Sequence, residues 1–259
     1  MPYGGHVRAA VIIPTYNEAG NIVEVSERVL AQPGVTWLII VDDASPDGTG
    51  DLADQLHDRY PRRVRVVHRA GKLGLGTAYR AGFCEAMALG ADRLITMDAD
   101  GSHDPAIIPA MLAASGNADL VIGSRYVTGG GTRDWGWHRQ ILSSWANRVA
   151  HLAAGLKAHD GTSGFRCYTS DLLQRVPLDA IQSNGYSYLV EILYHCQRAG
   201  ARITEVPIVF RDRRRGASKL SRAEILHAIG TVFRLAWRRR CNRPARAAPH
   251  DDGKDVRRD

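Results

Sequence analysis

The chain has 259 residues, of which 44% are hydrophobic and 24% are charged, an ordinary globular composition. These proportions exclude a mostly disordered chain, a fibrous repeat and a small disulfide-stabilised protein, and the length suits one large α/β domain or two small ones. The net charge of +7 is concentrated at one end, because residues 211–259 balance to +9 and the residues before them to −2. This distribution indicates contact with phosphates or an anionic surface, so we expect no nucleic-acid partner.

The cysteines and the apolar runs bear on the compartment. Cys84, Cys167, Cys196 and Cys241 are scattered without the spacing of metal ligands. No secretory signal opens the chain, and no window approaches the roughly 18 uninterrupted apolar residues that cross a bilayer. We therefore expect a cytoplasmic protein in a reducing environment that does not span a membrane.

Apolar runs and helical spacings alternate through the first half of the chain. A strand is predicted at 8–14, followed by a helix whose Ile22, Val25 and Val29 share one face and which ends at Pro33-Gly34. Further strands are predicted at 37–41, 64–67, 94–97 and 120–122, and helices at 47–60 and 77–89. Asp104-Pro105 is typical of an N-cap followed by proline at the first helical position.

The second half is less regular. A glycine-rich loop with two tryptophans is predicted at 128–138, helices at 139–155 and 186–199, and a strand at 202–210. Residues 221–240 form a predicted amphipathic helix with an apolar stripe of Ile225, Ile229, Val232, Phe233, Ala236 and Trp237. We expect three parts: a main domain over 1–220, this helix, and a disordered tail over 241–259.

Continuous apolar strands that alternate with helices indicate an α/β fold with a mostly parallel sheet and helices on both faces. In such sheets, ligands bind beyond the carboxyl ends of the strands. The predicted strands that end at Ile13, Val41, Met97 and Ile122 are each followed by polar, turn-forming residues. These four strand ends are where we expect the functional site.

Polar groups and an aromatic ring follow the first strand in Pro14-Thr15-Tyr16-Asn17-Glu18, as suits a nucleoside pocket, although an ordinary turn has the same composition. Asp42 and Asp43 follow the second strand. Two adjacent acids at the end of an apolar run are costly unless something uses them, and a carboxylate there can accept hydrogen bonds from a ribose or a base. Helix capping by Ser45 or Asp47 is the alternative for this stretch, and it leaves both acids unexplained.

Asp98 and Asp100 follow the fourth strand with one residue between them. In an extended segment this spacing puts both carboxylates on one face, and Ser102 continues the same spacing. Carboxylate oxygens suit Mg²⁺ or Mn²⁺, which can in turn hold a diphosphate. The alternative is an acidic loop in which Asp104 is only a helix cap.

A glycine loop and several cations complete the candidates. Gly71-Lys72-Leu73-Gly74-Leu75-Gly76 matches neither a dinucleotide-binding nor a P-loop pattern, so it is either a phosphate-approaching loop or a tight turn before a helix. Arg125 follows the fifth strand, and Arg139 and Ser143 share one face of a predicted helix. Together with Arg213 and Lys219, these cations suit phosphate groups, whereas their basic neighbours in 211–222 are typical of a solvated surface.

Seven stretches, in this order, resemble the polyprenol-phosphate mannose synthases, which are inverting family-2 glycosyltransferases with the GT-A (Rossmann-like) fold. They are VIIPTYNEAGNI, IIVDDASPDGT, GKLGLGTAYRAG, ITMDADGSHDP, VIGSRYVTGGG, DGTSGFRCY and RRRGASKL, spanning about residues 11–220. The resemblance implies mannose transfer from GDP-mannose to polyprenyl (dolichyl-type) monophosphate, with Mg²⁺ or Mn²⁺ as cofactor. It also implies a peripheral position on the cytoplasmic face of a membrane, reached through the membrane surface or a membrane-embedded partner protein.

The same resemblance implies roles for residues at the matching positions. It makes Asp98, Asp100 and Ser102 the metal ligands, with a water bridge possible at the short Ser102, and Arg125, Arg139 and Ser143 the acceptor-phosphate site. The resemblance also implies that Asp100, Arg125 and Arg139 are the catalytic residues. Contacts to the nucleotide sugar are implied for Pro14, Tyr16, Glu18, Val41, Asp43, Asp98, Ala99, Asp100, Arg125, Arg213 and Lys219.

Three alternatives remain at the level of sequence. The same fold could use another donor, such as UDP-glucose. A non-catalytic scaffold that regulates a membrane partner is a second alternative, against which the intact acid pair and cations argue. The helix predicted at 221–240 either meets the membrane through its stripe and terminal arginines or packs on the protein's own core.

Overall fold

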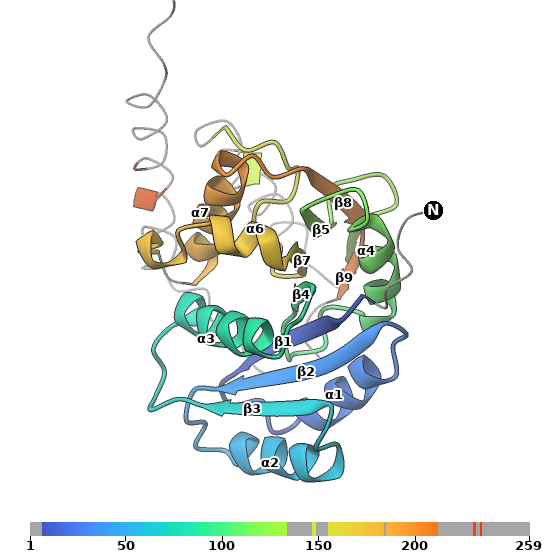
Figure 1. Cartoon of the computed structure of the whole chain (residues 1–259), viewed down its shortest axis with the longest axis vertical. Helices are drawn as coiled ribbons and strands as arrows, with labels where there is room; N and C mark the ends of the chain where they lie inside the picture. Colours follow the sequence, from blue (N-terminus) through green and yellow to red (C-terminus); the bar gives the residue numbers. More distant parts are fainter. Residues whose placement is uncertain are drawn as a thin grey trace, which may run out of the picture.

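The computed structural model describes residues 7–133, 147–148, 155–183 and 185–211, together with 230, 231 and 234. Its centre is a seven-stranded sheet with the strand order β3-β2-β1-β4-β7-β5-β8 (Figure 1). The strands are β1 (Ala9–Thr15), β2 (Val35–Asp42), β3 (Val64–His68), β4 (Arg93–Thr96), β5 (Leu120–Ser124), β7 (Arg166–Thr169) and β8 (Ile203–Pro207). All neighbouring pairs are parallel except those that β7 makes with β4 and β5.

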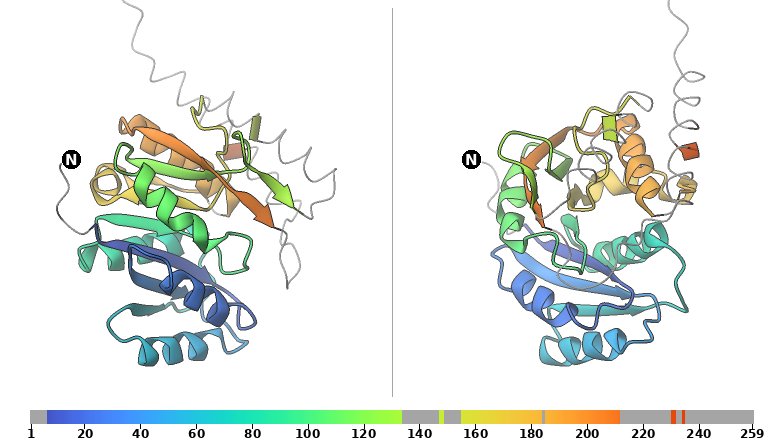
Figure 2. Two further views of the ribbon diagram at one scale, coloured as in Figure 1. Left: turned by 90° about the vertical axis from the view of Figure 1, so that its right-hand side faces the viewer. Right: turned by 180° about the vertical axis from the view of Figure 1, so that it is seen from behind.

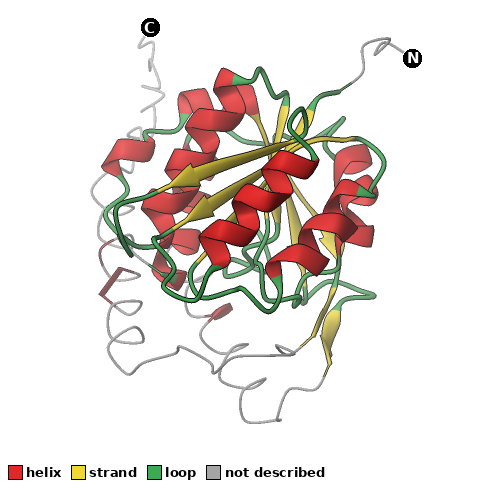
Figure 3. Cartoon of the chain, turned by 90° about the horizontal axis from the view of Figure 1, so that it is seen from below, coloured by secondary structure: helices red, strands yellow, loops and turns green. Residues whose placement is uncertain are grey.

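Helices cover both faces of this sheet (Figures 1 and 3). One apolar core joins the sheet to α3 (Leu75–Ala88), α6 (Ser170–Arg175) and α7 (Tyr186–Arg198). The other joins it to α1 (Ile22–Leu30), α2 (Thr49–Arg59) and α4 (Ile108–Ala114). Successive residues of β1 alternate between the two, with Ile12 in the first core and Ile13 in the second, as the pleat of a strand requires. The predicted α/β fold with a mostly parallel, doubly covered sheet is confirmed.

The glycines of the stretch 71–82 serve the packing of α3. Gly74 has φ +98° just before the helix, a backbone conformation that side-chain-bearing residues rarely adopt. A Cβ on Gly76 would lie 2.4 Å from the ring of Tyr188, and one on Gly82 would lie 2.3 Å from Cγ2 of Ile12. Glycine therefore lets α3 lie directly against β1 and α7, which supports the tight-turn interpretation of this stretch.

Most predicted elements agree with the structure to within two residues. The cap is also confirmed, because the Asp104 side chain accepts a hydrogen bond from Ala106 N at the start of the short helix η1 (Pro105–Ile107). The helices predicted at 139–155 and 221–240 and the tail at 241–259 lie almost wholly outside the described residues. Among the residues described, no helix is long and apolar enough to cross a membrane.

Two predictions about the second half are wrong. The single strand expected at 202–210 is two strands, β8 in the main sheet and β9 (Val209–Arg211) in a separate two-stranded sheet with β6 (Gly131–Arg133) (Figure 2). The chain changes partners at Ile208, whose N–H donates to the carbonyl of Ser124, the last residue of β5. Part of the expected glycine-rich loop is therefore strand β6, which pairs in parallel with β9.

Candidate active site

The carboxyl ends of β1, β2 and β4 bring the polar stretches of the sequence to one edge of the sheet. Thr15 pairs with Asp42 across β1 and β2, and the N–H of Asp43 donates to Thr15 O at 3.1 Å. On the other side of β1, Met97 N donates to Ile12 O at 3.1 Å, which places the Asp98–Asp100 stretch beside it. As the rule about strand ends predicts, these polar stretches lie together at one edge of the sheet.

The loops after β1 and β2 are joined to each other by side chains. Ser45 Oγ accepts from Asn17 N at 3.0 Å, Thr49 Oγ1 from Glu18 N at 2.9 Å, and Asp47 from Ala19 N at 3.1 Å. Burial opposes ionisation of Asp47, but its hydrogen bonds from Thr49 and Ala19 outweigh this and hold its pKa below the usual range. The stretch that contains Tyr16 and Glu18 is therefore fixed against the stretch that contains Asp43.

The two adjacent acids have different partners. Asp42 is buried and accepts from Thr15 Oγ1 at 2.9 Å, from Ser45 Oγ at 2.6 Å and from Ser45 N at 3.0 Å, so its carboxylate holds the loop together. Asp43 makes an ion pair with Arg69 at 2.7 Å, in which both side chains are only 8% exposed. Burial raises the pKa of Asp43, and the Arg69 guanidinium opposes that rise.

Lys72, from the glycine stretch, also reaches this part of the site. Its ammonium lies 4.5 Å from the centre of the Tyr16 ring, in a cation–π contact, and the backbone of Leu73 hydrogen-bonds to Asp43. The glycine stretch therefore borders the surface where the predicted nucleotide contacts Tyr16 and Asp43 lie. Its lysine is positioned beside the expected nucleoside and not only in a turn.

The acid pair lies on the loop between β4 and η1. Asp100 is buried, and its Oδ1 accepts from Ser102 N at 3.0 Å. The Asp98 side chain is 37% exposed and lies 3.9 Å from Nδ1 of the buried His103, which accepts a hydrogen bond from Asp98 N at 3.2 Å. Asp98 also borders Gly164, where a Cβ would lie 3.4 Å from its Oδ1. The Asp98 carboxylate thus lies against the backbone of the stretch that follows Asp160.

These residues fit a divalent cation that is shared with a substrate. The Ser102 hydroxyl is buried, and among the described residues it has no hydrogen-bond partner, although its oxygen is a hard donor next to Asp100. No group of three or more His, Cys, Asp or Glu side chains suited to a metal occurs in the described residues. Two carboxylates with a hydroxyl suit Mg²⁺ or Mn²⁺, because such ions typically use one or two carboxylates and complete their shells with water and substrate phosphate.

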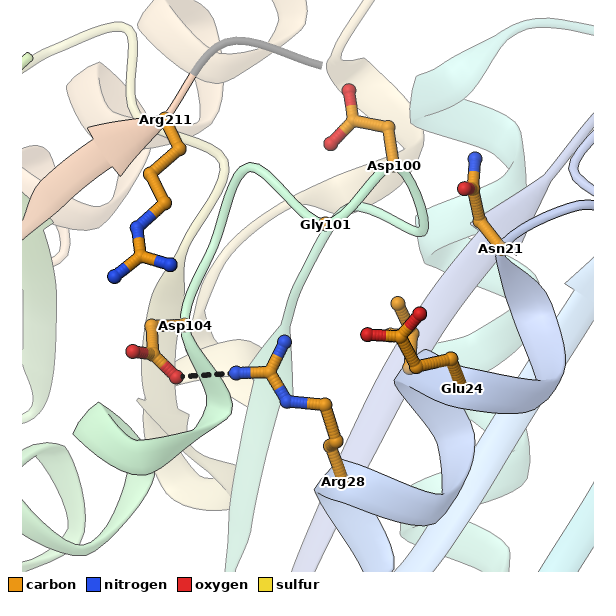
Figure 4. A pocket seen from close by; sticks show the side chains of 8 residues that line it. Asn21, Glu24, Arg28, Asp100, Gly101, Asp104 and Arg211 are labelled. Atoms are coloured by element: carbon orange, nitrogen blue, oxygen red, sulfur yellow. Dashed lines mark hydrogen bonds and ion pairs between the residues drawn. The ribbon is translucent and has the colours of Figure 1, made fainter. Parts of the chain in front are cut away.

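A pocket adjoins Asp100 between α1 and this loop (Figure 4). Its walls carry an ion pair of 2.8 Å between Arg28 and Asp104, and Arg211 of β9 lies across from α1. The lining consists of Asn21, Glu24, Val25, Arg28, Asp100, Gly101, Asp104 and Arg211. Polar and charged groups of both signs therefore line the pocket beside Asp100.

Arg125 directly follows β5 and is almost fully buried in an ion pair with Asp160. Its Nε donates to Asp160 Oδ2 at 2.8 Å and its Nη2 to Asp160 Oδ1 at 2.7 Å, while Nη2 also donates to Thr162 Oγ1 at 2.7 Å. The Arg125 N–H adds a bond of 3.0 Å to Asp160 Oδ2. Burial would raise the pKa of Asp160, but Arg125 outweighs it and holds that pKa below the usual range.

Of the remaining predicted site residues, some lie in the described part of the structure and others lie outside it. Pro14 and Val41 pair across β1 and β2, and Ala99 lies buried between the two acids. Arg139, Ser143, Arg213 and Lys219 lie outside the described residues. Sequence reasoning missed Arg69 and Asp160; the strand-end rule, applied also to β3, would have found Arg69.

The solved structures similar to this chain define its fold. Glucosyl-3-phosphoglycerate synthase from Mycobacterium tuberculosis, in complex with phosphoglyceric acid, has a TM-score of 0.66 and 20% identity, covering 89% of this chain and 80% of that one. The same enzyme in complex with Mn²⁺, UDP-glucose and phosphoglyceric acid has a TM-score of 0.63 at 20% identity, with the same coverage. The fold is the GT-A glycosyltransferase fold.

Residues 10–177 match the family described as Glycosyl transferase family 2. Polyprenol monophosphomannose synthase of Mycolicibacterium smegmatis is 43% identical over 237 residues, 91% of this chain and 89% of that protein. Undecaprenyl-phosphate mannosyltransferase of Micrococcus luteus is 43% identical, covering 88% and 93%, and dolichol-phosphate mannosyltransferase of Pyrococcus furiosus is 36% identical, covering 88% and 64%. The chain therefore belongs to glycosyl transferase family 2, in the group that contains these polyprenyl-phosphate mannosyltransferases, and the resemblance found in its motifs is confirmed.

Proposed function

We propose that this enzyme transfers mannose from GDP-mannose to a polyprenyl monophosphate with inversion, giving polyprenyl-phosphate β-mannose as a lipid-linked mannose donor. The observation that carries the proposal is the identity of 43% to two proteins named for mannose transfer to a polyprenyl phosphate, over 88–91% of this chain. The geometry supports it, because the expected nucleotide contacts follow β1 and β2, the acids Asp98 and Asp100 follow β4, and the buried Arg125 follows β5 of the same sheet.

The acceptor determines which catalytic groups are needed. A phosphate monoester has its second pKa at about 6 and is already a nucleophilic anion at neutral pH, so no general base is required. The obstacle is repulsion between this anion and the diphosphate of the donor. Arg125 and Arg139, with Ser143, would bind the acceptor phosphate and reduce its negative charge. Arg213 and Lys219 would do the same for the departing GDP.

On the donor side, Pro14, Tyr16, Glu18, Val41 and Asp43 would hold the nucleoside, and Asp98, Ala99 and Asp100 would border the diphosphate and sugar. The fixed loops after β1 and β2 favour this role, because they need little ordering when a nucleotide binds. Asp98, Asp100 and Ser102 would hold Mg²⁺ or Mn²⁺, which as a Lewis acid stabilises the negative charge of the leaving diphosphate.

The proposed location is the cytoplasmic face of a membrane, with 1–220 as catalytic domain and 221–240 as the segment that meets the membrane or a membrane-embedded partner. Thr231 and Arg234 support this, because they contact the domain through Ser183 at 3.0 and 2.8 Å, and Arg234 pairs with the buried Glu191 at 3.4 Å. In the helix predicted at 221–240, these two positions lie opposite the apolar stripe. A polar side toward the domain leaves the stripe for lipid.

The test offers radiolabelled GDP-mannose or UDP-glucose with polyprenyl phosphate and measures which label enters the organic phase. We expect mannose label only, and its loss in EDTA or in Asp100→Ala. Asp104→Ala, which removes the cap beside the pocket but keeps the acid pair, is the matched control and should retain transfer. Glucose label would reassign the donor, transfer that persists in EDTA would contradict the metal role, and no transfer by the wild type would favour a regulatory scaffold.

A further inference from the structure

Asp160, the partner of Arg125, opens the stretch DGTSGFRCY, and none of the residue roles implied by the resemblance falls on that stretch. Asp160 has a fully buried side chain, and both of its carboxylate oxygens receive the guanidinium of Arg125. With Thr162, the carboxylate takes up three of the five N–H donors of that guanidinium. A planar guanidinium that is hydrogen-bonded along one edge has its plane fixed.

The loop that carries Asp160 is itself held rigidly. Arg166 of β7 is fully buried and donates to the carbonyls of Gly161 and Leu189 at 2.8 Å and to that of Ser163 at 2.7 Å. Asn147 Oδ1 accepts from Gly161 N at 2.9 Å, and Glu205 Oε1 accepts from Asp160 N at 3.0 Å. The antiparallel strand β7 thus supplies an arginine that donates to two backbone carbonyls of the loop around Asp160, those of Gly161 and Ser163.

We infer that Asp160 is a positioning residue, which aims the Arg125 guanidinium at the phosphate of the acceptor, and that Arg166 keeps the Asp160 loop in the place this requires. The inference rests on the proposed function, since it assigns Arg125 to the acceptor phosphate. A carboxylate that merely stabilised the fold would have no reason to affect one substrate more than the other. The expected signature is therefore a selective loss of acceptor binding.

The chain supplies a matched control on the same strand. Asp119 precedes β5 as Arg125 follows it, and Asp119 receives Arg202 through Nε at 3.1 Å, Nη2 at 3.0 Å and the backbone N–H at 2.8 Å. This bidentate aspartate–arginine pair lies at the other end of β5, away from the site. Asp119→Asn removes a pair of the same bidentate geometry, although a more exposed one, without touching Arg125.

The experiment measures KM for both substrates in Asp160→Asn, Asp119→Asn and the wild type. Misaiming a charged hydrogen bond to phosphate should raise the acceptor KM of Asp160→Asn by about 10- to 100-fold, with the GDP-mannose KM changed less than about twofold. Asp119→Asn should change neither. In an Arg125→Ala background, Asp160→Asn should add nothing further to the acceptor KM. Equal rises for both substrates, or additivity with Arg125→Ala, would overturn the inference.

Two further measurements keep the test decisive. If Asp160→Asn does not fold, Thr162→Val keeps the ion pair but removes one partner of Nη2, and it should raise the acceptor KM about threefold; an unchanged value overturns the inference. Calorimetric titration with farnesyl phosphate as a soluble probe separates the two proposals. A wild type that binds this probe more tightly than Asp160→Asn but transfers no mannose refutes the proposed function alone, whereas equal binding refutes the positioning role.

Discussion

The pair of Arg69 and Asp43 gives a sharp test of what burial does to an ion pair beside the nucleotide contacts. Its atoms are 2.7 Å apart, and those of the pair between Arg59 and Glu27 are 2.8 Å apart. The first pair is 8% exposed on both sides, while the second is 57% and 47% exposed. Arg→Met at each position removes the charge and keeps the apolar stem, so the two variants differ chiefly in burial.

The expected costs are far apart. Arg69→Met leaves the buried Asp43 without its guanidinium and also removes the bond of 2.6 Å from Arg69 to Thr77 Oγ1. Breaking a buried pair in this way costs about 3–5 kcal/mol, whereas loss of an exposed pair such as that of Arg59 costs about 0–1 kcal/mol. Urea unfolding followed by circular dichroism measures both. Equal destabilisation by the two variants would refute the reasoning from burial.

The pH dependence of the same variant checks the cause. Burial already raises the pKa of Asp43 above its ordinary value of 3.8, and Arg69 opposes that rise, so Arg69→Met should raise it further. The folded state then binds a proton more tightly than the unfolded state, and stability increases as the pH falls through the folded pKa. The deficit in unfolding free energy of Arg69→Met relative to the wild type should therefore shrink as the pH falls through the raised pKa of Asp43, and a constant deficit would show that the charge of Asp43 is not the cause.

The remaining predictions concern the acceptor, the membrane and acid stability. Arg139→Ala should raise KM for the lipid phosphate by about tenfold and leave that for GDP-mannose nearly unchanged; steady-state kinetics with both substrates checks this. Trp237→Glu should weaken co-sedimentation with anionic liposomes, and undiminished binding would favour packing of this helix on the domain. Arg125 lowers the folded pKa of Asp160 below 3.8, so the ion pair stabilises the fold above that pH. This stabilisation is lost as the pH falls through the folded pKa of Asp160. The unfolding free energies of the wild type and Asp160→Asn should therefore converge in acid.

The sequence predicted the site best where position along the chain decides it. Because polar residues that follow parallel strands meet at one edge, the groups after β1, β2 and β4 were located without any knowledge of side-chain contacts. The Asp104 cap was likewise predictable, since a cap depends only on the next few residues. The features that could be predicted from the sequence are thus those that depend on the position of a residue after a strand or on hydrogen bonds to the next few residues.

The features that could not be predicted from the sequence depend on contacts between segments that lie far apart along the chain. Nothing in the dipeptide Asp42-Asp43 distinguishes the acid that fixes a loop from the acid that pairs with Arg69, because the difference arises from which neighbour each meets after folding. Strand β7 has four residues and is buried between β4 and β5, so it carries neither alternation nor length to mark it. Asp160 and Arg125 are 35 residues apart and meet only because β7 inserts antiparallel into the sheet.

The charges around β7 also bear on how a paired arginine can attract a phosphate. A lone buried guanidinium would be costly, and Asp160 removes that cost by pairing with Arg125, yet a neutral pair alone would draw an anion weakly. Arg166 adds a second positive charge close enough to lower the pKa of Asp160, while its own N–H groups go to backbone carbonyls. With the Glu205 carboxylate, which accepts from Asp160 N, two guanidiniums and two carboxylates balance, so without Arg166 the group would carry a net negative charge and repel an anion. Replacing Arg166 by a neutral residue would therefore weaken acceptor binding in two ways. It would remove a positive charge near the phosphate, and it would remove the hydrogen bonds that hold the Asp160 loop in place.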